Sequence, residues 1–115
     1  MPKTSSMNFK VKTISVFERQ AKRLMKKFPS LKKELQILIS DLKMDPNKGT
    51  PIVHGCHKIR LAISSKGKGK SGGARVITHV IFQEDTVFLL SIYDKSEMEN
   101  LTDNEIVELI NQIEL

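Results

Sequence analysis

The chain has few of the residues that define several whole classes of protein. Its 115 residues include one cysteine, one tyrosine and no tryptophan. A lone Cys56 cannot form a disulfide within the chain, so a disulfide framework and dithiol redox chemistry are not indicated. No apolar run approaches the roughly 18 residues that span a bilayer, and the first residues lack the apolar stretch of a secretory signal. We therefore expect a cytoplasmic protein without membrane contact.

Length and composition favour one folded unit. A chain of this length can bury a core but is too short for two ordinary domains. With 39% apolar and 28% charged residues, the composition is near that of globular proteins, so neither disorder nor a fibrous structure is suggested. We therefore treat residues 1–115 as a single domain.

Acidic residues are missing from a central stretch of the chain. Residues 54–83 carry six Lys or Arg and no acid, whereas residues 84–115 carry one cation and nine acids. Residues 1–53 are also basic, with twelve cations against four acids. An acid-free basic stretch is expected of a surface that binds a polyanion such as a nucleic acid, although a solvated basic surface has the same pattern.

The N-terminal half predicts one strand and two helices. Residues 8–13 alternate polar and apolar side chains, which is typical of a short strand. Apolar residues then recur at helical spacing over residues 16–28 and 31–44, with Pro29 and Ser30 between the two runs. Ser30 is expected to be an N-cap whose hydroxyl accepts from a free amide of the second helix. Helices joined by so short a link are expected to pack as an antiparallel hairpin.

The C-terminal half predicts three strands and one more helix. Residues 57–64 alternate polar and apolar side chains, and residues 74–82 and 86–93 are apolar, β-branched runs separated by a hairpin-length link. Thr102 and Glu105 match a capping box before a final apolar stripe within residues 102–115. The expected fold is therefore α+β, with an N-terminal helical hairpin packed on a small antiparallel sheet and a short C-terminal helix.

The segment Ser65–Gly73 contains four glycines and three lysines between the first two of those three strands. Gly69-Lys70-Ser71 resembles the end of a P-loop, but that motif requires glycine where Ser64 stands and a helix where a strand is expected. The pattern instead predicts a hairpin whose cations bind phosphates with an affinity that falls steeply with salt. These cations are Lys58, Arg60, Lys66, Lys68, Lys70 and Arg75.

Histidine and cysteine lie close together at His54, Cys56 and His57, a grouping that can indicate zinc. A structural zinc site normally needs four ligands, and His79 is the only other histidine in the sequence. We therefore expect neither a metal nor a cofactor.

Three blocks of sequence resemble the signature of HigB-type members of the RelE/ParE toxin superfamily. In order, they are Lys58-Ile59-Arg60, Lys66–Arg75 (KGKGKSGGAR) and Leu90–Glu97 (LSIYDKSE). The expected order of helix pair, three-stranded meander and short last helix also matches this superfamily, so the resemblance covers nearly the whole chain. It implies the toxin of a type II toxin–antitoxin pair.

The resemblance also implies an activity, partners and site residues. Many members cut messenger RNA in the ribosomal A site without a metal, using the 2′-hydroxyl of the RNA as the nucleophile. The implied partners are mRNA, the ribosome and a cognate antitoxin, which is often a helix-turn-helix protein. Carried over residue by residue, the catalytic positions are Lys58, Arg60, Arg75 and Lys95, and the RNA-binding positions are Lys66, Lys68, Lys70, His79 and Tyr93.

Elementary chemistry assigns different roles to these cations. Attack by a 2′-hydroxyl needs a proton acceptor, stabilisation of charge on the phosphorane and a proton donor for the leaving 5′-oxygen. Arginine keeps its proton at neutral pH, so Arg60 and Arg75 are expected to clamp phosphate. Lysine crowded among other cations gives up its proton more readily, so we expect Lys58 or Lys95 to share in proton transfer.

Some features depart from the family pattern, and other functions stay open. His79 stands where relatives commonly carry an aromatic residue, and it is either a substitute RNA-contacting group or a structural residue of the sheet. The last helix has no tyrosine, which some ribosome-dependent members use to stack on a base. The same fold also supports a ParE-like inhibitor of DNA gyrase or a nucleic-acid-binding module without catalysis. The cations on the strands favour the ribonuclease.

Overall fold

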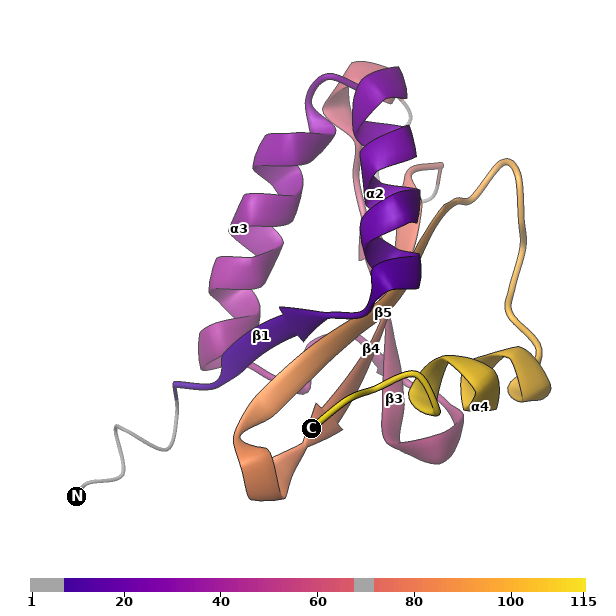
Figure 1. Ribbon diagram of the computed structural model, residues 1–115. Coiled ribbons are helices and arrows are strands. Elements are labelled where there is room, and N and C mark those ends of the chain that lie inside the picture. Colours follow the sequence, from indigo (N-terminus) through magenta and orange to yellow (C-terminus); the bar gives the residue numbers. More distant parts are fainter. Residues whose placement is uncertain (1–7, 68–71) are drawn as a thin grey trace.

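A five-stranded sheet with helices on both faces forms the protein in the computed structural model, which describes residues 8–67 and 72–115 (Figure 1). The expected α+β fold is confirmed. In chain order, the elements are β1 (Lys10–Thr13), α2 (Ser15–Lys27), α3 (Leu31–Met44), β2 (Thr50–Pro51), β3 (Cys56–Leu61), β4 (Ala74–Ile81), β5 (Thr86–Asp94) and α4 (Asp103–Ile110). Short 3-10 turns lie between them: η1 (Val53–Gly55), η2 (Ser64–Lys66) and η3 (Phe82–Glu84).

The strand order is β1-β5-β4-β3-β2. The three strands β3, β4 and β5 form the predicted antiparallel meander. Two pairings extend it: β1 lies parallel to β5 at one edge, and the two-residue β2 lies antiparallel to β3 at the other. Sequence periodicity predicted the strand at residues 8–13 but not its partner, because β1 and β5 are separated by more than seventy residues.

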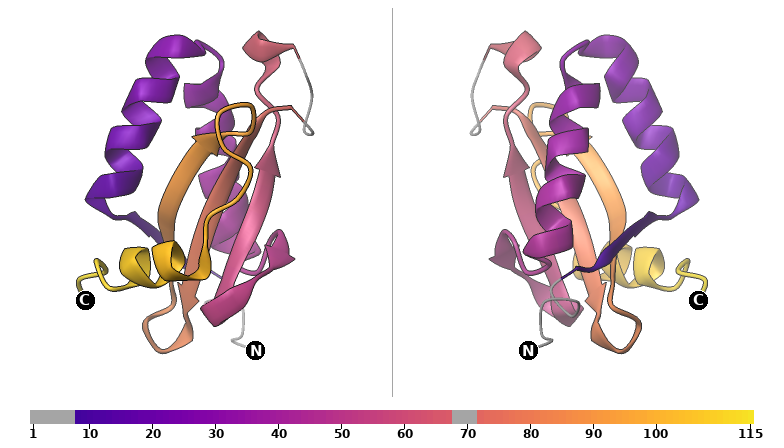
Figure 2. Two further views of the ribbon diagram at one scale, coloured as in Figure 1. Left: turned by 90° about the vertical axis from the view of Figure 1, so that its right-hand side faces the viewer. Right: turned by 90° about the vertical axis from the view of Figure 1, so that its left-hand side faces the viewer.

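The helical hairpin α2–α3 covers one face of the sheet, and α4 packs against the other (Figure 2). Both hairpin helices bury the apolar stripes that their sequences predicted. The main core lies between these stripes and the strands, where Ile59, Val76 and Ile92 form a buried row across β3, β4 and β5. Burial of these aliphatic side chains removes apolar surface from water and fixes which face of each strand the hairpin covers.

Ser30 does not cap α3 as predicted. Its backbone is already in the right-handed helical region, so its hydroxyl makes no bond to a helix amide. The hydroxyl instead donates to the Glu34 carboxylate and accepts from the amide of Ser65 at 3.0 Å each. Glu34 also accepts from the amide of Ser64 at 2.8 Å. These bonds tie the start of α3 to η2. The strand predicted over residues 57–64 ends early, at Leu61, and η2 begins at Ser64.

The capping box of α4 is confirmed. The Thr102 hydroxyl accepts from the Glu105 amide at 3.1 Å, and the Glu105 carboxylate accepts from the Thr102 amide at 2.7 Å. The helix ends at Ile110, before the end of the predicted range. Across residues 8–67 and 72–115, we find no helix with the length and apolar character required to cross a membrane.

Candidate functional site

Arg60 of β3, Arg75 of β4 and Tyr93 of β5 lie in one transverse row of the sheet. Arg60 is the register partner of Arg75, and Arg75 is the partner of Tyr93. Paired residues on neighbouring strands project to the same face, and neighbouring strands lie about 4.8 Å apart, so three side chains leave one face within about 10 Å. Lys58 lies two residues before Arg60 on β3 and therefore projects to this face as well.

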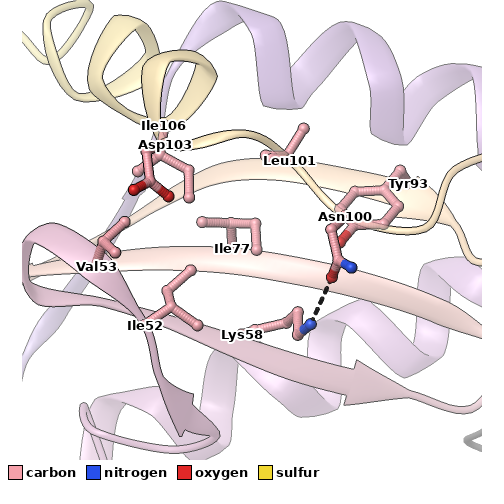
Figure 3. Close-up of a pocket in the computed structure, with 9 residues that line it drawn as sticks. All are labelled: Ile52, Val53, Lys58, Ile77, Tyr93, Asn100, Leu101, Asp103 and Ile106. Carbon is pink, nitrogen blue, oxygen red and sulfur yellow. Dashed lines mark hydrogen bonds between the residues drawn. The ribbon is translucent and has the colours of Figure 1, made fainter.

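This row lies on the sheet face that α4 covers in part. Lys58 and Tyr93 line a pocket together with Leu101 and Ile106, which belong to the segment before α4 and to α4 itself (Figure 3). The hairpin α2–α3 covers the opposite face (Figure 2). The fold therefore brings three of the predicted catalytic cations, Lys58, Arg60 and Arg75, to one side of the molecule.

The residues on this face differ in their exposure to solvent. Arg60 is exposed and Lys58 is half-buried. Arg75 is only 4% exposed, and its guanidinium donates to the carbonyl oxygen of Ala74 at 3.2 Å. Arg60 is therefore the arginine of the row that solvent reaches, while Arg75 supplies positive charge from beneath the surface, beside Tyr93.

Lys95, the fourth predicted catalytic cation, directly follows β5. Its amide donates to the carbonyl oxygen of Gly73 at 3.0 Å, which extends the ladder by one bond and keeps Lys95 on the face of Tyr93. Its ammonium group donates to Glu99 at 3.3 Å. Lys95 therefore lies beside the row, with part of its charge balanced by a carboxylate.

The segment between β5 and α4 approaches the row through Asn100. The ammonium group of Lys58 donates to the Asn100 side-chain oxygen at 2.8 Å (Figure 3). Sequence reasoning missed Asn100, because it follows the third family-like block and belongs to no periodic element. Glu97, in the same segment, binds Arg23 at 2.8 Å and Lys27 at 3.4 Å, which anchors the segment to α2. The hydrogen bond from Arg23 lowers the pKa of Glu97.

Tyr93 is 5% exposed, and its hydroxyl has no hydrogen-bond partner among the residues that the structure describes. Burial raises the pKa of this hydroxyl, the nearby charge of Arg75 acts to lower it, and Glu99 adds to the rise. The hydroxyl therefore stays protonated at neutral pH and can donate or accept a hydrogen bond.

Lys66, a predicted RNA-binding residue, is held by the end of β5. It forms an ion pair with Asp94 and donates to the Gly72 carbonyl at 2.7 Å. Burial acts to raise the pKa of Asp94, but the bonds from Lys66 and Ser96 outweigh it and lower the pKa. Lys68 and Lys70, predicted beside it, lie outside the described residues.

His79 lies on β4 at the end of the sheet opposite Arg75. Its Nδ1 is 3.5 Å from the thiol of Cys56, its register partner on β3. Burial lowers the pKa of His79, and a hydrogen bond with the backbone of Gly55 opposes this shift. Burial also raises the pKa of Cys56 to about 11. These contacts give His79 a structural setting, and no metal-binding group of three or more His, Cys, Asp or Glu occurs within residues 8–67 and 72–115.

The model of the family described as "RelE toxin of RelE / RelB toxin-antitoxin system" matches residues 9–113. The chain belongs to the RelE toxin family. It is therefore a toxin of the type II toxin–antitoxin class, as the resemblance to the RelE/ParE superfamily implied. The cation row on β3 and β4 thus lies in a RelE fold, and the likeness to HigB-type members within the superfamily stays a prediction.

Solved structures share the RelE fold at low sequence identity. A mutant of E. coli toxin RelE in the free state has a TM-score of 0.58 and 18% identity, with 94% of this chain and 100% of that chain covered. The RelBE2 toxin–antitoxin complex from Mycobacterium tuberculosis gives a TM-score of 0.56 and 16% identity, with 76% of this chain and 92% of that chain covered. At these identities the likeness establishes the fold alone.

Proposed function

We propose that this toxin is an endoribonuclease that cleaves messenger RNA on the ribosome by attack of the RNA's own 2′-hydroxyl. The observation that carries the proposal is the register row Arg60–Arg75–Tyr93, with Lys58 on the same face. A row of cations on one sheet face suits a phosphodiester, whose charge must be held while a pentacoordinate phosphorus forms. A protein that inhibits gyrase by binding alone has no need of several phosphate-facing cations.

Each residue has a distinct task in this reaction. The 2′-oxygen bonds to phosphorus, the bond from phosphorus to the 5′-oxygen breaks, and one proton moves at each oxygen. Arg60 is exposed and has the planar donor fork that binds two phosphate oxygens at once. Lys58 is the candidate for proton transfer, because its ammonium group lies on the same face and lysine can exchange its proton. Lys95 is the second candidate, beside the row. No step in this scheme requires a metal.

The proposed partners are mRNA, the ribosome and a cognate antitoxin. The M. tuberculosis structure that shares this fold is a toxin–antitoxin complex. An antitoxin for this chain would control the toxin most directly by covering Arg60, the exposed member of the row. The cytoplasm is the compartment in which all three partners meet.

Cleavage on programmed ribosomes tests this function. Purified protein is added to ribosomes that carry a defined message, and new 5′ ends are mapped by primer extension. We expect codon-phased cuts, with losses of about 10²- to 10⁴-fold for Lys58→Ala and about 10²- to 10³-fold for Arg60→Ala. Lys22→Ala and Arg19→Ala are matched controls, because both side chains are exposed on α2, behind the sheet.

The outcomes separate the candidate functions. Equal losses in the α2 controls would show that general basicity, and not the row, supports the activity. Growth arrest with DNA-damage signalling and no new RNA ends would indicate the gyrase inhibitor. RNA binding without cleavage by the wild type, in the presence of ribosomes, would leave only a binding module.

A further inference from the structure

A pocket of about 150 Å³ lies between the sheet face of the cation row and α4 (Figure 3). Its walls are mainly apolar and come from the β2–η1 region, β4 and the start of α4. The apolar residues are Ile52, Val53, Ile77, Leu101 and Ile106. Lys58, Asn100 and Tyr93 lie at one end of the pocket, and Asp103 lies toward the other end.

The Tyr93 hydroxyl gives this pocket the character of a binding site. The side chain is more than nine-tenths buried, and its hydroxyl points into the pocket toward Asn100, yet it bonds to none of the described residues. Buried polar groups in folded proteins are nearly always satisfied, so an orphaned hydroxyl at a pocket calls for a ligand group. Asn100 offers its amide N–H donors at the same end, and its oxygen accepts from Lys58.

We propose that this pocket takes one pyrimidine base of the RNA substrate, a step that rests on the proposed function. Size favours a pyrimidine, because an apolar cavity of about 150 Å³ holds a single benzene ring. One six-membered ring matches such a space, whereas the two fused rings of a purine would extend from the open side of the pocket. Proteins that read RNA sequence splay out unpaired bases and bond to their edges, which Asn100 and Tyr93 are placed to do.

Charge favours a neutral group over phosphate at the α4 end of the pocket. The carboxylate of Asp103 lines the pocket, and it would repel a phosphate group while tolerating a neutral heterocycle. Lys58 lines the same pocket and also belongs to the cation face. The base in the pocket is therefore attached to a nucleotide next to the phosphate held by the row, and the toxin cuts beside a pyrimidine.

Nucleotide titrations of the full-length, isotope-labelled protein test this pocket without cleavage. The probes are CMP, UMP, AMP, GMP and ribose 5-phosphate, followed by NMR signals of the Asn100 side-chain amide and the Ile77 and Val53 methyl groups. We expect CMP and UMP to shift these signals saturably, with about five- to a hundredfold weaker binding of the purines, the range for a bidentate contact to one base. Ribose 5-phosphate should leave the pocket signals in place.

Three variants locate the effect. Val53→Phe fills the pocket from a partly exposed position and should abolish the pocket shifts with every nucleotide, whereas Asn100→Ala removes the edge-reading amide and should weaken the binding of CMP and UMP. Asn104→Ala, at an exposed residue of α4 that does not line the pocket, should leave the binding of CMP and UMP unchanged. Equal shifts by purines and pyrimidines, or pocket shifts caused by ribose 5-phosphate, would overturn the inference even if the ribosome assay shows cleavage. Pyrimidine binding without any cleavage would instead refute the proposed function.

Discussion

The ammonium group of Lys66 forms an ion pair with the carboxylate of Asp94, which is 1% exposed. The amide and hydroxyl of Ser96 donate to the same carboxylate oxygen at 2.9 and 2.8 Å. Lys66 also binds the Gly72 carbonyl, so one lysine joins both flanks of residues 68–71 to the end of β5. The pair therefore holds in place the backbone from which Arg75 and Lys95 extend.

Replacing Lys66 with alanine should destabilise the fold strongly. The change leaves a buried carboxylate without its counter-ion, which costs about 3 kcal/mol. The measurement is the free energy of unfolding in urea. Lys66→Ala combined with Asp94→Asn should cost less than the two single changes together, with a coupling of at least about 1 kcal/mol.

Lys48 provides the matched control for this cycle. Its pair with Asp41 spans 3.9 Å between two exposed side chains, so Lys48→Ala should change the free energy of unfolding by less than about 1 kcal/mol. Strict additivity of the Lys66 and Asp94 variants would mean that the ion pair does not support this end of the sheet.

Local patterns predicted the helices and strands, because each type of element requires its own spacing of apolar residues along the sequence. Period-two alternation placed Lys58 and Arg60 on one face of β3, and the register confirms that Arg75 and Tyr93 share it. Helical spacing likewise predicted the buried stripes of both hairpin helices. These features depend on neighbours within a few residues, which a sequence displays directly.

Contacts between distant segments were not predictable in the same way. The sequence pattern predicted Lys66 to be one of several loop cations, and nothing nearby in the sequence indicated Asp94 as its buried partner. Asn100 meets Lys58 only because the segment before α4 folds back over the sheet. The burial of Arg75 likewise depends on what the chain packs over β4, which alternation cannot reveal.

The stability of the fold should depend on pH through His79. Burial lowers the pKa of His79 in the folded state from its ordinary value of 6.5. The unfolded state therefore binds more protons just below pH 6.5, so the free energy of unfolding falls as the pH drops from 6.5 to the folded-state pKa. Urea unfolding at a series of pH values should show this loss.

The variant His79→Gln should flatten that part of the pH profile. His54→Gln is its control, because His54 is exposed on η1 and accepts from the Cys56 thiol through its backbone carbonyl. If the pH profile is unchanged in His79→Gln and flattened in His54→Gln, the pH dependence comes from His54, and the prediction for His79 is wrong.

Cys56 should resist thiol reagents in the folded protein. The residue is fully buried, and its pKa of about 11 leaves almost no thiolate near neutral pH. Ellman's reagent should react with one thiol per chain in denaturing urea and with almost none in buffer. Fast labelling of the native protein would mean that β3 and β4 separate readily where Cys56 faces His79.

The capping box should decide how firmly α4 covers the pocket. Thr102→Ala removes the acceptor for the Glu105 amide and should cost about 1 kcal/mol of helix stability, whereas Thr102→Ser keeps the hydroxyl and should cost much less. Because α4 is only eight residues long, this loss should appear first as local fraying and not as global unfolding. Hydrogen exchange at Ile106 and Leu109 measures it, since both are buried on the inner face of α4. Faster exchange at these amides in Thr102→Ala, with β4 unchanged, is the expected result. Equal exchange in both variants would mean that packing on the sheet, and not the cap, holds α4 in place.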